Sequence, residues 1–407
     1  MKLTWKKALK ALVIAALIVV FGGGALLVSF VFARLGLTPL YVTRIIPVVG
    51  IALLLGWILS AIGYLPSQWI KRVWLAVFCV CLGSAAYAGW GAYHDNIPTV
   101  DDHSLILRDY IPFDEENQLV TLEDEASLRF SSPYAVSLDG ATALYPMYAA
   151  FVQAVYPDCW ENSGIEIDYS PYNSTVECNG TIDAYERLIR GEVDLIFAAA
   201  PSQAQLDAVD QTGKEFHLTP IGREAFVFFV NSKNPVTNLT VEQIRGIYSG
   251  TITNWREVGG KNQKIRPFQR AENSGSQTSL QKLMADLPLM EPEEEDRIAG
   301  MGEIIREVAS YRNYKNAIGF SFRYYSTEMV QNGDIRLLAL NGVEPTREAI
   351  RDDSYPIASE FYAITCAPIG APSPETSNQK LAALLAWILS EEGQELVEKT
   401  GYVALGP

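Results

Sequence analysis

Three short segments of this chain place a glycine and a hydroxyl side chain where a loop would turn into a helix. They are Asp139–Thr142, Asn179–Thr181 and Arg270–Ser276. The start of a helix leaves backbone N–H groups without partners and carries a partial positive charge. Glycine lets a ligand approach those groups, and Ser or Thr adds a hydroxyl donor. If the three segments converge, they form a binding site for a small oxyanion.

Arg270 supplies the formal positive charge that such a site needs. Its planar guanidinium matches two oxygens of an oxyanion at once. Each segment alone is typical of an ordinary helix cap, so the prediction rests on their combination.

Other kinds of site find less support in the sequence. A serine hydrolase based on Ser274 lacks the G-x-S-x-G elbow, and among the three histidines only His217 is placed to be its base. No closely spaced His/Cys set predicts a metal site in residues 92–407, and we expect neither cofactor nor catalysis. The chain carries a net charge of −15 while residues 1–91 carry +8, so residues 92–407 carry −23. That charge disfavours nucleic acid as a partner and leaves anion capture to short-range hydrogen bonds.

The elements that would position these segments alternate along the chain from about Ser132. Apolar residues at helical spacing predict a helix from Leu144 to Val155, with Pro146 in its permissive first turn. Thr240 and Gln243 have the spacing of a capping box. Short apolar runs predict strands near residues 193–199, 225–230, 318–322, 335–340 and 361–366. This alternation predicts an α/β fold with largely parallel strands.

Residues 1–93 have the composition of a membrane region. Three uncharged runs, at about 11–33, 45–68 and 73–93, are each long enough to cross a bilayer, which takes roughly 20 helical residues. If each run crosses the membrane, six basic residues lie on the same side of it as the N-terminus, and two lie on the opposite side. The bias predicts a multi-pass cell-membrane protein with a cytoplasmic N-terminus and its remaining domain on the outer face. A signal-like first segment followed by two spans is the alternative.

Residues 94–131 are rich in acids, and we interpret them as a solvated linker rather than an embracing arm. Cys159 and Cys178 flank one short outer segment, and the sequence leaves open whether they form a disulfide.

Residues from about 133 to 407 resemble the phosphate-binding receptors of phosphate ABC transporters, which have the type II periplasmic-binding-protein fold. The resemblance covers about two thirds of the chain. It rests on four stretches: DGATALYP at 139–146, LIRGEVDLIFAAAP at 188–201, IRGIYSGTITNWREVGG at 244–260 and RAENSGS at 270–276.

The resemblance implies that a ligand sits between two lobes, lobe 1 at about 132–222 and 361–407 and lobe 2 at about 223–360. It implies a site of hydroxyls, backbone amides and one Arg, with Glu272 orienting the Arg. The ligand-binding residues so implied are Gly140, Thr142, Ala143, Thr181, Arg270, Ser274, Gly275 and Ser276.

One position departs from the family pattern. Family receptors commonly have, after the strand equivalent to residues 193–199, an Asp that accepts a proton from hydrogen phosphate; here that position is Ala199. Sulfate has no proton to give, so this change leaves the choice between phosphate and sulfate open. Asp139 and Glu224 are the candidate replacements.

The sequence therefore predicts a membrane-anchored, extracytoplasmic binding protein for a small oxyanion, with phosphate first. Its implied partners are membrane lipid and the permease subunits of an ABC transporter. A membrane-tethered sensor or scaffold with the same fold is the alternative, because three spans are more than a delivery receptor needs. The oligomeric state stays open.

Overall fold

The structure of the protein is a computed structural model. It describes residues 40–61, 66–95, 99–100, 107–157, 167–172, 174–292, 311–312, 314–324, 326–327 and 335–406. The chain divides into two compact units, Met1–Ile97 and Pro98–Pro407.

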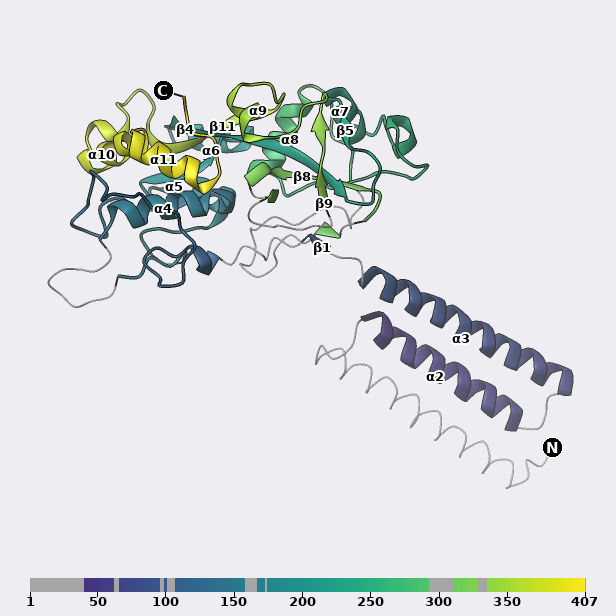
Figure 1. Cartoon of the computed structure of the whole chain (residues 1–407). Helices are drawn as coiled ribbons and strands as arrows, with labels where there is room; N and C mark the ends of the chain where they lie inside the picture. Colours follow the sequence, from purple (N-terminus) through teal and green to yellow (C-terminus); the bar gives the residue numbers. More distant parts are fainter. Residues whose placement is uncertain are drawn as a thin grey trace. The chain divides into compact units, whose positions relative to one another are not determined.

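The first unit contains two described helices, α2 (Leu40–Ala61) and α3 (Ser67–Asp95). They lie side by side (Figure 1). At their contact a Cβ added to Gly56 would lie 3.0 Å from Val77 Cγ2, so a glycine lets the two backbones come close. Trp74 Nε1 also donates a hydrogen bond of 3.0 Å to Ser60 Oγ.

Within the described residues, one helical stretch, Ser67–Trp90 in α3, is long and apolar enough to cross a membrane. The apolar part of α2, Pro47–Ser60, is shorter. The predicted second span, 45–68, differs from α2, which ends at Ala61, and α3 begins at Ser67 rather than at residue 73. The predicted first span, 11–33, lies outside the described residues.

The prediction that residues 94–131 form a solvated linker is wrong for residues 107–131, which follow the surface of the second unit as an arm. Apolar residues between the acids, among them Leu107, Phe113 and Phe130, pack against its core. Phe130 N–H donates to the Val155 carbonyl, and Lys399 Nζ donates to the Thr121 carbonyl. Because apolar side chains alternate with the acids, this stretch can bury one side and leave its charges in water.

The second unit is built on a sheet with the strand order β2, β3, β11, β4, β8, β6, and β9 also pairs with β4. Its strands are β2 (Leu138–Gly140), β3 (Leu195–Ala199), β4 (Lys214–Asn231), β6 (Arg266–Pro267), β8 (Ala317–Phe322), β9 (Ile335–Leu337) and β11 (Ala358–Pro368). Two smaller pairs are β1 (Thr99–Val100) with β7 (Tyr311–Arg312), and β5 (Asn238–Leu239) with β10 (Ala339–Leu340).

The prediction of largely parallel strands is wrong. The pairs β2–β3 and β6–β8 are parallel, but β11 runs antiparallel to both β3 and β4, and β4 runs antiparallel to β8 and β9. The strand predicted at 225–230 is the second half of β4, which begins at Lys214. Its first half is only partly buried and carries polar side chains, so the apolar run that marks a buried strand is missing there.

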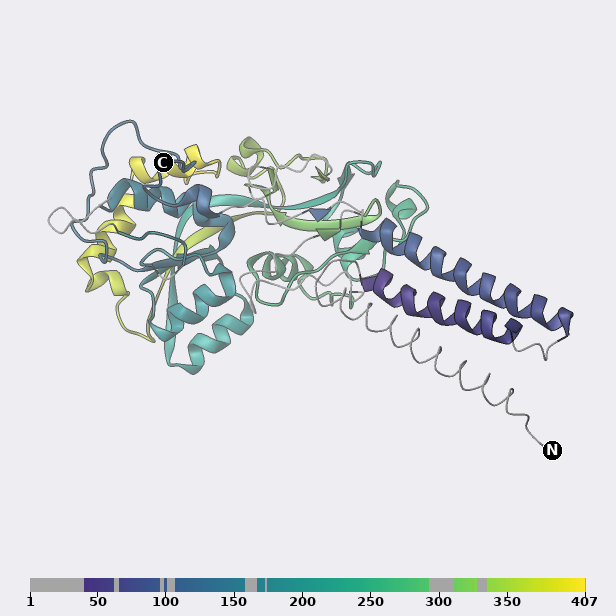
Figure 2. The same ribbon diagram turned by 90° about the horizontal axis from the view of Figure 1, so that it is seen from below.

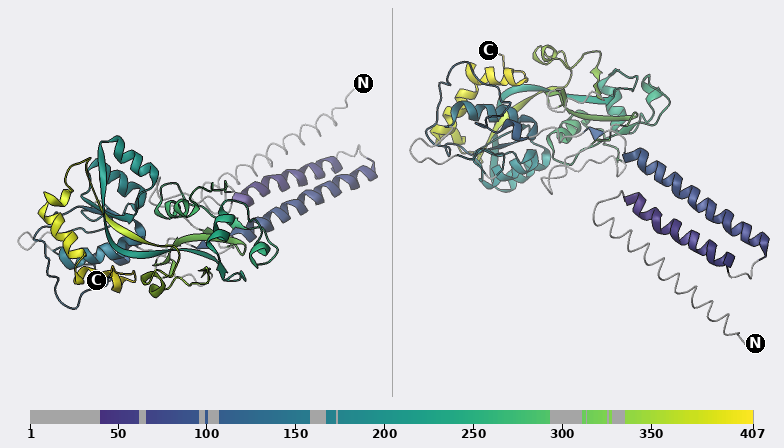
Figure 3. Two further views of the ribbon diagram at one scale, coloured as in Figure 1. Left: turned by 90° about the horizontal axis from the view of Figure 1, so that it is seen from above. Right: turned by 60° about the horizontal axis from the view of Figure 1, so that its bottom comes forward.

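Strand β4 joins two halves of the unit. Its residues up to Ala225 pair with β11, and those from Phe226 onward pair with β8. Figures 1 and 2 show α4, α5, α10 and α11 around one end of the sheet and α7, α8 and α9 around the other. The two views of Figure 3 show β4 and β11 passing between these ends.

The second unit contains eight described α-helices, and the helix predicted from Leu144 to Val155 is observed as α4. The eight are α4 (Tyr145–Val155), α5 (Gly180–Arg190), α6 (Gln203–Gln211), α7 (Val241–Tyr248), α8 (Gly275–Met284), α9 (Arg347–Arg351), α10 (Gln379–Ile388) and α11 (Glu391–Thr400). Short 3-10 turns lie at Leu107–Tyr110, Thr142–Leu144, Trp255–Val258 and Pro374–Thr376. The predicted capping box of Thr240 and Gln243 is confirmed at the start of α7, and Pro146 lies in the first turn of α4.

Cys178 is a buried free thiol. Cys159, with which the sequence left a disulfide open, lies outside the described residues. Burial raises the pKa of Cys178 to about 12, so the thiol stays protonated at neutral pH.

Candidate anion-binding site

The first predicted segment follows strand β2. A Cβ added to Gly140 would lie 2.7 Å from the Phe197 carbonyl oxygen, so only glycine fits at this contact with β3. The Ala141 N–H donates to the same carbonyl at 2.8 Å, and the chain then enters the turn that contains Thr142 and Ala143. The Tyr402 hydroxyl donates to the Ala143 carbonyl, which ties the turn to the C-terminal segment.

The second predicted segment forms the start of α5. The side chain of its N-cap residue, Asn179, does not cap the helix, because its Nδ2 donates instead to Asp139 and Glu177, each at 2.8 Å. The turn before α4 likewise has no side-chain cap. By contrast, α6, α7, α9 and α10 are each capped by their own Ser, Thr or Asn. The helix starts of the two predicted segments therefore keep N–H groups that no cap side chain satisfies.

The third predicted segment leads into α8. Ser274 caps this helix: its Oγ accepts from Gln277 N–H at 3.3 Å and donates to the Ala271 carbonyl at 2.9 Å. The Arg270 N–H donates to Gln277 Oε1 at 2.9 Å, which fixes the backbone of Arg270 to the first turn of the helix. Asn273 adopts a left-handed conformation with φ of 65°, which Asn tolerates better than most residues.

One cavity brings the three segments together. It has a volume of about 420 Å³, including the part open to solvent, and Ala143, Thr181 and Gly275 line it, one from each segment. A Cβ added to Gly275 would lie 3.4 Å from Thr181 Oγ1 and 3.7 Å from Ala199 Cβ. The third segment therefore meets the second directly, although about 90 residues separate them in the sequence.

The remaining predicted residues are not among those that line this cavity. Gly140, Thr142, Arg270, Ser274 and Ser276 are not in its wall, and Ser276 is buried. Glu272 is exposed, and its carboxylate accepts a hydrogen bond of 2.7 Å from Gln281 Nε2.

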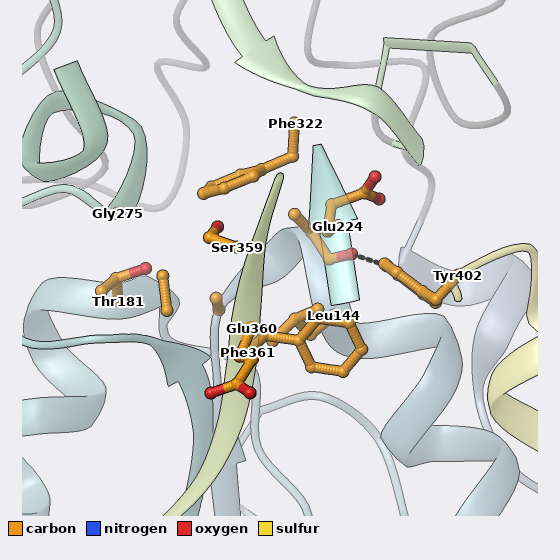
Figure 4. Close-up of a pocket in the computed structure, with 12 residues that line it drawn as sticks. Leu144, Thr181, Glu224, Gly275, Phe322, Ser359, Glu360, Phe361 and Tyr402 are labelled. Carbon is orange, nitrogen blue, oxygen red and sulfur yellow. Dashed lines mark hydrogen bonds between the residues drawn. The ribbon is translucent and has the colours of Figure 1, made fainter. Parts of the chain in front are cut away.

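Several lining residues were not predicted from the sequence. They are Ala141, Leu144, Phe322, Ser359, Glu360, Phe361 and Tyr402. Ser359, Glu360 and Phe361 lie at the start of β11, opposite β4, where polar and apolar residues mix and no helix-start motif marks a ligand site. Figure 4 shows the Thr181 and Ser359 side chains projecting into the cavity from different walls.

The two carboxylates considered as replacements at Ala199 differ in position. Glu224 lines the cavity and is buried, and its oxygens accept from Ala225 N–H at 2.8 Å and Tyr324 N–H at 3.0 Å. In Figure 4 its carboxylate points away from Thr181. Asp139 is fully buried and is not among the lining residues.

The fold does not support the serine-hydrolase alternative. Ser274 Oγ is engaged in capping α8, and His217 lies on β4 opposite Thr365, outside the cavity wall. The two side chains thus lie on separate elements, and no contact between them is observed among the described residues.

Comparison with known proteins gives a consistent picture. The PBP superfamily domain matches residues 124–392. The phosphate-binding protein PstS of Borreliella burgdorferi is 24% identical over 276 residues, which cover 66% of this chain and 90% of that protein. The phosphate-binding protein PstS of Staphylococcus epidermidis is 24% identical over 232 residues, covering 55% and 68% of the two chains. The solved structure of an ABC-type phosphate transport receptor from Vibrio cholerae covers 66% of this chain and all of its own, with 20% identity and a TM-score of 0.42.

Proposed function

Because the chain belongs to the PBP superfamily, we propose that residues 132–407 are a receptor that binds phosphate outside the cytoplasm and delivers it to an ABC transporter. The observation that carries this proposal is the single cavity lined by Ala143, Thr181 and Gly275. The relatives named phosphate-binding proteins support phosphate as the ligand. The receptor binds and releases its ligand without changing it, so the proposal needs no catalytic group.

The proposed site holds the ligand by hydrogen bonds from all three segments. Ala143, Thr181 and Gly275 line the cavity, and the proposed donors are the Ala143 amide, the Thr181 hydroxyl and the Gly275 amide, with the Ser276 hydroxyl beside them. The hydroxyls of Thr142 and Ser274 join them by giving up their present partners, Cys178 and the Ala271 carbonyl. Gly140 allows the first turn to approach β3 closely. Since the Gln277 N–H is taken by the Ser274 cap, the N–H groups of Gly275 and Ser276 are the ones that α8 offers to an anion.

Arg270 is proposed to supply charge and two parallel hydrogen bonds to the ligand. Its backbone bond to Gln277 supports this role, because it holds the start of the side chain beside the first turn of α8. Glu272 is proposed to orient the guanidinium when a ligand is bound. In its present position Glu272 bonds Gln281, so this role requires the carboxylate to change partner.

The ligand would bind between two lobes, at about 132–222 with 361–407 and at about 223–360. Support for this division comes from β4, which changes its partner from β11 to β8 between Ala225 and Phe226. Thr181 and Ala199 belong to the first lobe and Gly275 to the second, so a ligand that touches all three favours closure. A closed cleft strengthens hydrogen bonds to the anion by excluding water, and closure is what a transporter would recognise.

We propose that the N-terminal region crosses the membrane three times, at about 11–33, within α2 and within α3, with a cytoplasmic N-terminus. The exposed apolar side chains of α3, including Trp69, Leu75, Phe78 and Leu82, support contact with lipid, because a patch of this kind is costly in water. Protease added outside intact cells should remove a C-terminal epitope tag and spare an N-terminal one. Loss of both tags, or of neither, would refute this topology.

The function is tested by calorimetric titration of the full-length protein in lipid nanodiscs, first with phosphate and then with sulfate. Tight binding of phosphate is the expected result. Binding of neither anion would contradict the proposal and favour a sensor or scaffold that keeps the fold for another purpose.

A further inference from the structure

Asp139 is the middle residue of β2 and the first residue of the first segment, and its side chain is fully buried. Oδ1 accepts from the N–H groups of Gly140 at 2.8 Å and Asn179 at 2.9 Å. Oδ2 accepts from Asn179 Nδ2 at 2.8 Å and Arg187 Nη1 at 3.1 Å. The carboxylate thus receives one bond from the first segment and two from the second, and a fourth comes from α5.

A carboxylate can accept about four hydrogen bonds, and these four donors already supply them. Asp139 therefore has no acceptor position left for a ligand. It cannot be the proton acceptor that replaces the missing carboxylate at Ala199, although the sequence alone left that role open.

A second carboxylate completes the cluster. Glu177 Oε1 accepts from Arg187 Nη2 at 2.8 Å, and Glu177 Oε2 accepts from Asn179 Nδ2 at 2.8 Å. Burial raises the pKa of Asp139, whereas the bonds from Asn179 and Gly140 and the charge of Arg187 oppose that shift. The donors thereby offset the cost of burying a charge at this point.

We propose that Asp139 is a positioning residue of the anion site, whose carboxylate holds the first two segments at the spacing at which Ala143 and Thr181 face one cavity. This inference rests on the proposed oxyanion-binding function. Ala143 lies four residues after Asp139, and Thr181 lies two residues after Asn179, so a shift at the carboxylate passes directly to the groups that face the ligand.

The test variant is Asp139→Asn, which keeps the shape of the side chain but replaces one oxygen with an NH2 group. Whichever way the new amide turns, its NH2 group faces two groups that donate to a carboxylate oxygen in the original protein. An NH2 group cannot accept those hydrogen bonds. Asp194→Asn is the matched control. Asp194 is the residue before β3, and its Oδ2 accepts from the N–H at 2.8 Å and the Oγ at 2.7 Å of Ser137, the residue before β2; unlike Asp139, it is exposed.

Affinity for phosphate and for arsenate is measured on the full-length proteins in nanodiscs. We expect Asp139→Asn to weaken both anions by about tenfold or more and by similar factors, since a displaced segment affects every oxyanion. Asp194→Asn should stay within about twofold of the original protein, as surface changes usually do. Equal affinities for Asp139→Asn and the original protein would overturn the proposal, even if the variant were less stable to heat.

A second variant guards against failure of Asp139→Asn to fold. Asn179→Ala removes the amide bonds to Asp139 and Glu177 but keeps the backbone bond of 2.9 Å, and a drop in affinity of about threefold to tenfold is expected. Unchanged affinity in this variant would also overturn the proposal.

Hydrogen exchange separates this inference from the proposed function. In the ligand-free state, Asp139→Asn should speed amide exchange in peptides covering residues 138–145 and 177–184 relative to Asp194→Asn. If the original protein binds neither anion, the proposed function fails, and faster exchange in both peptides would still support the role of Asp139 in holding the two segments. Exchange that is unchanged in both peptides would overturn it.

Discussion

At the scale of single residues, the chemistry of the site depends on which groups can accept a proton from the ligand. Ala199 presents a methyl group to the cavity at the point where its relatives would be expected to carry a carboxylate. Asp139 is saturated by four donors, and Glu224 directs its carboxylate toward the backbone of Ala225 and Tyr324. With such a wall, hydrogen-bond donors rather than an acceptor dominate recognition, and discrimination against sulfate is expected to be weak.

Ala199→Asp should therefore raise the preference for phosphate over sulfate. The new carboxylate would lie close to Gly275, where it accepts the proton of hydrogen phosphate and repels sulfate. A carboxylate next to an unprotonated anion costs a few kcal/mol, so the ratio of the two affinities should rise by about tenfold or more. Competitive titration measures this ratio. Ala200→Asp is the control, because Ala200 is not among the residues that line the cavity. An equal rise in the control would show that the gain is not local.

At the scale of the elements, the sequence predicted the helices better than the sheet. The residues that start helices, such as Thr240 and Ser274, are local signals, and both helices begin where those signals stand. The pairing of the long strand β4 with β11 was not predicted, because it joins residues more than 130 positions apart. No local pattern reports a contact of that range.

The site residues at helix starts could be predicted from the sequence, whereas those on the sheet could not. Helix-start motifs identified the segments of Ala143, Thr181 and Gly275, which the cavity brings together. Ser359 and Glu360 were missed because they belong to β11, whose place beside the cavity follows from the sheet topology. Which carboxylate reaches a ligand also depends on side-chain direction, which the sequence does not encode locally.

A contact between the two proposed lobes should influence closure. Ser202 Oγ at the start of α6 donates to Asn273 Oδ1 at 2.9 Å, and Gln205 Nε2 donates to the Asn273 carbonyl at 3.3 Å. Asn273→Gly removes the first bond and tolerates the positive φ. Affinity for phosphate should fall by about threefold to tenfold, as expected for the loss of one hydrogen bond between the two proposed lobes.

The control for this variant is Asn341→Gly, which makes the same change at another positive φ, in a turn beside β10. It should leave the affinity unchanged. Fluorescence transfer between dyes on the two proposed lobes reports closure directly. An unchanged closed fraction in Asn273→Gly would refute the role of this contact.

At the scale of the whole molecule, residues 92–407 carry a net charge of −23. The charge repels an anion at long range, while capture relies on donors inside the cavity. Salt shortens the distance over which charges act, to about 10 Å at 0.1 M. It therefore weakens the long-range repulsion more than the hydrogen bonds inside the cavity.

The association rate for phosphate should therefore rise with ionic strength, by about twofold or more between low and moderate salt. Stopped-flow mixing of the full-length protein in neutral-lipid nanodiscs measures this rate. A rate that falls with salt would indicate attraction by a local positive field, and would contradict this account of capture.

The most direct test of the central claim is equilibrium dialysis of radiolabelled phosphate against Arg270→Ala in the full-length protein. Loss of a buried charged partner costs about 2–5 kcal/mol, so the affinity should fall by about 30-fold or more while the fold is retained. Arg190→Ala is the matched control: Arg190 lies on the exposed side of α5 and pairs with Glu192 at 2.6 Å. Strong loss in Arg270→Ala with no change in Arg190→Ala is the predicted result. Equal phosphate binding by both variants and the original protein would contradict the proposed site.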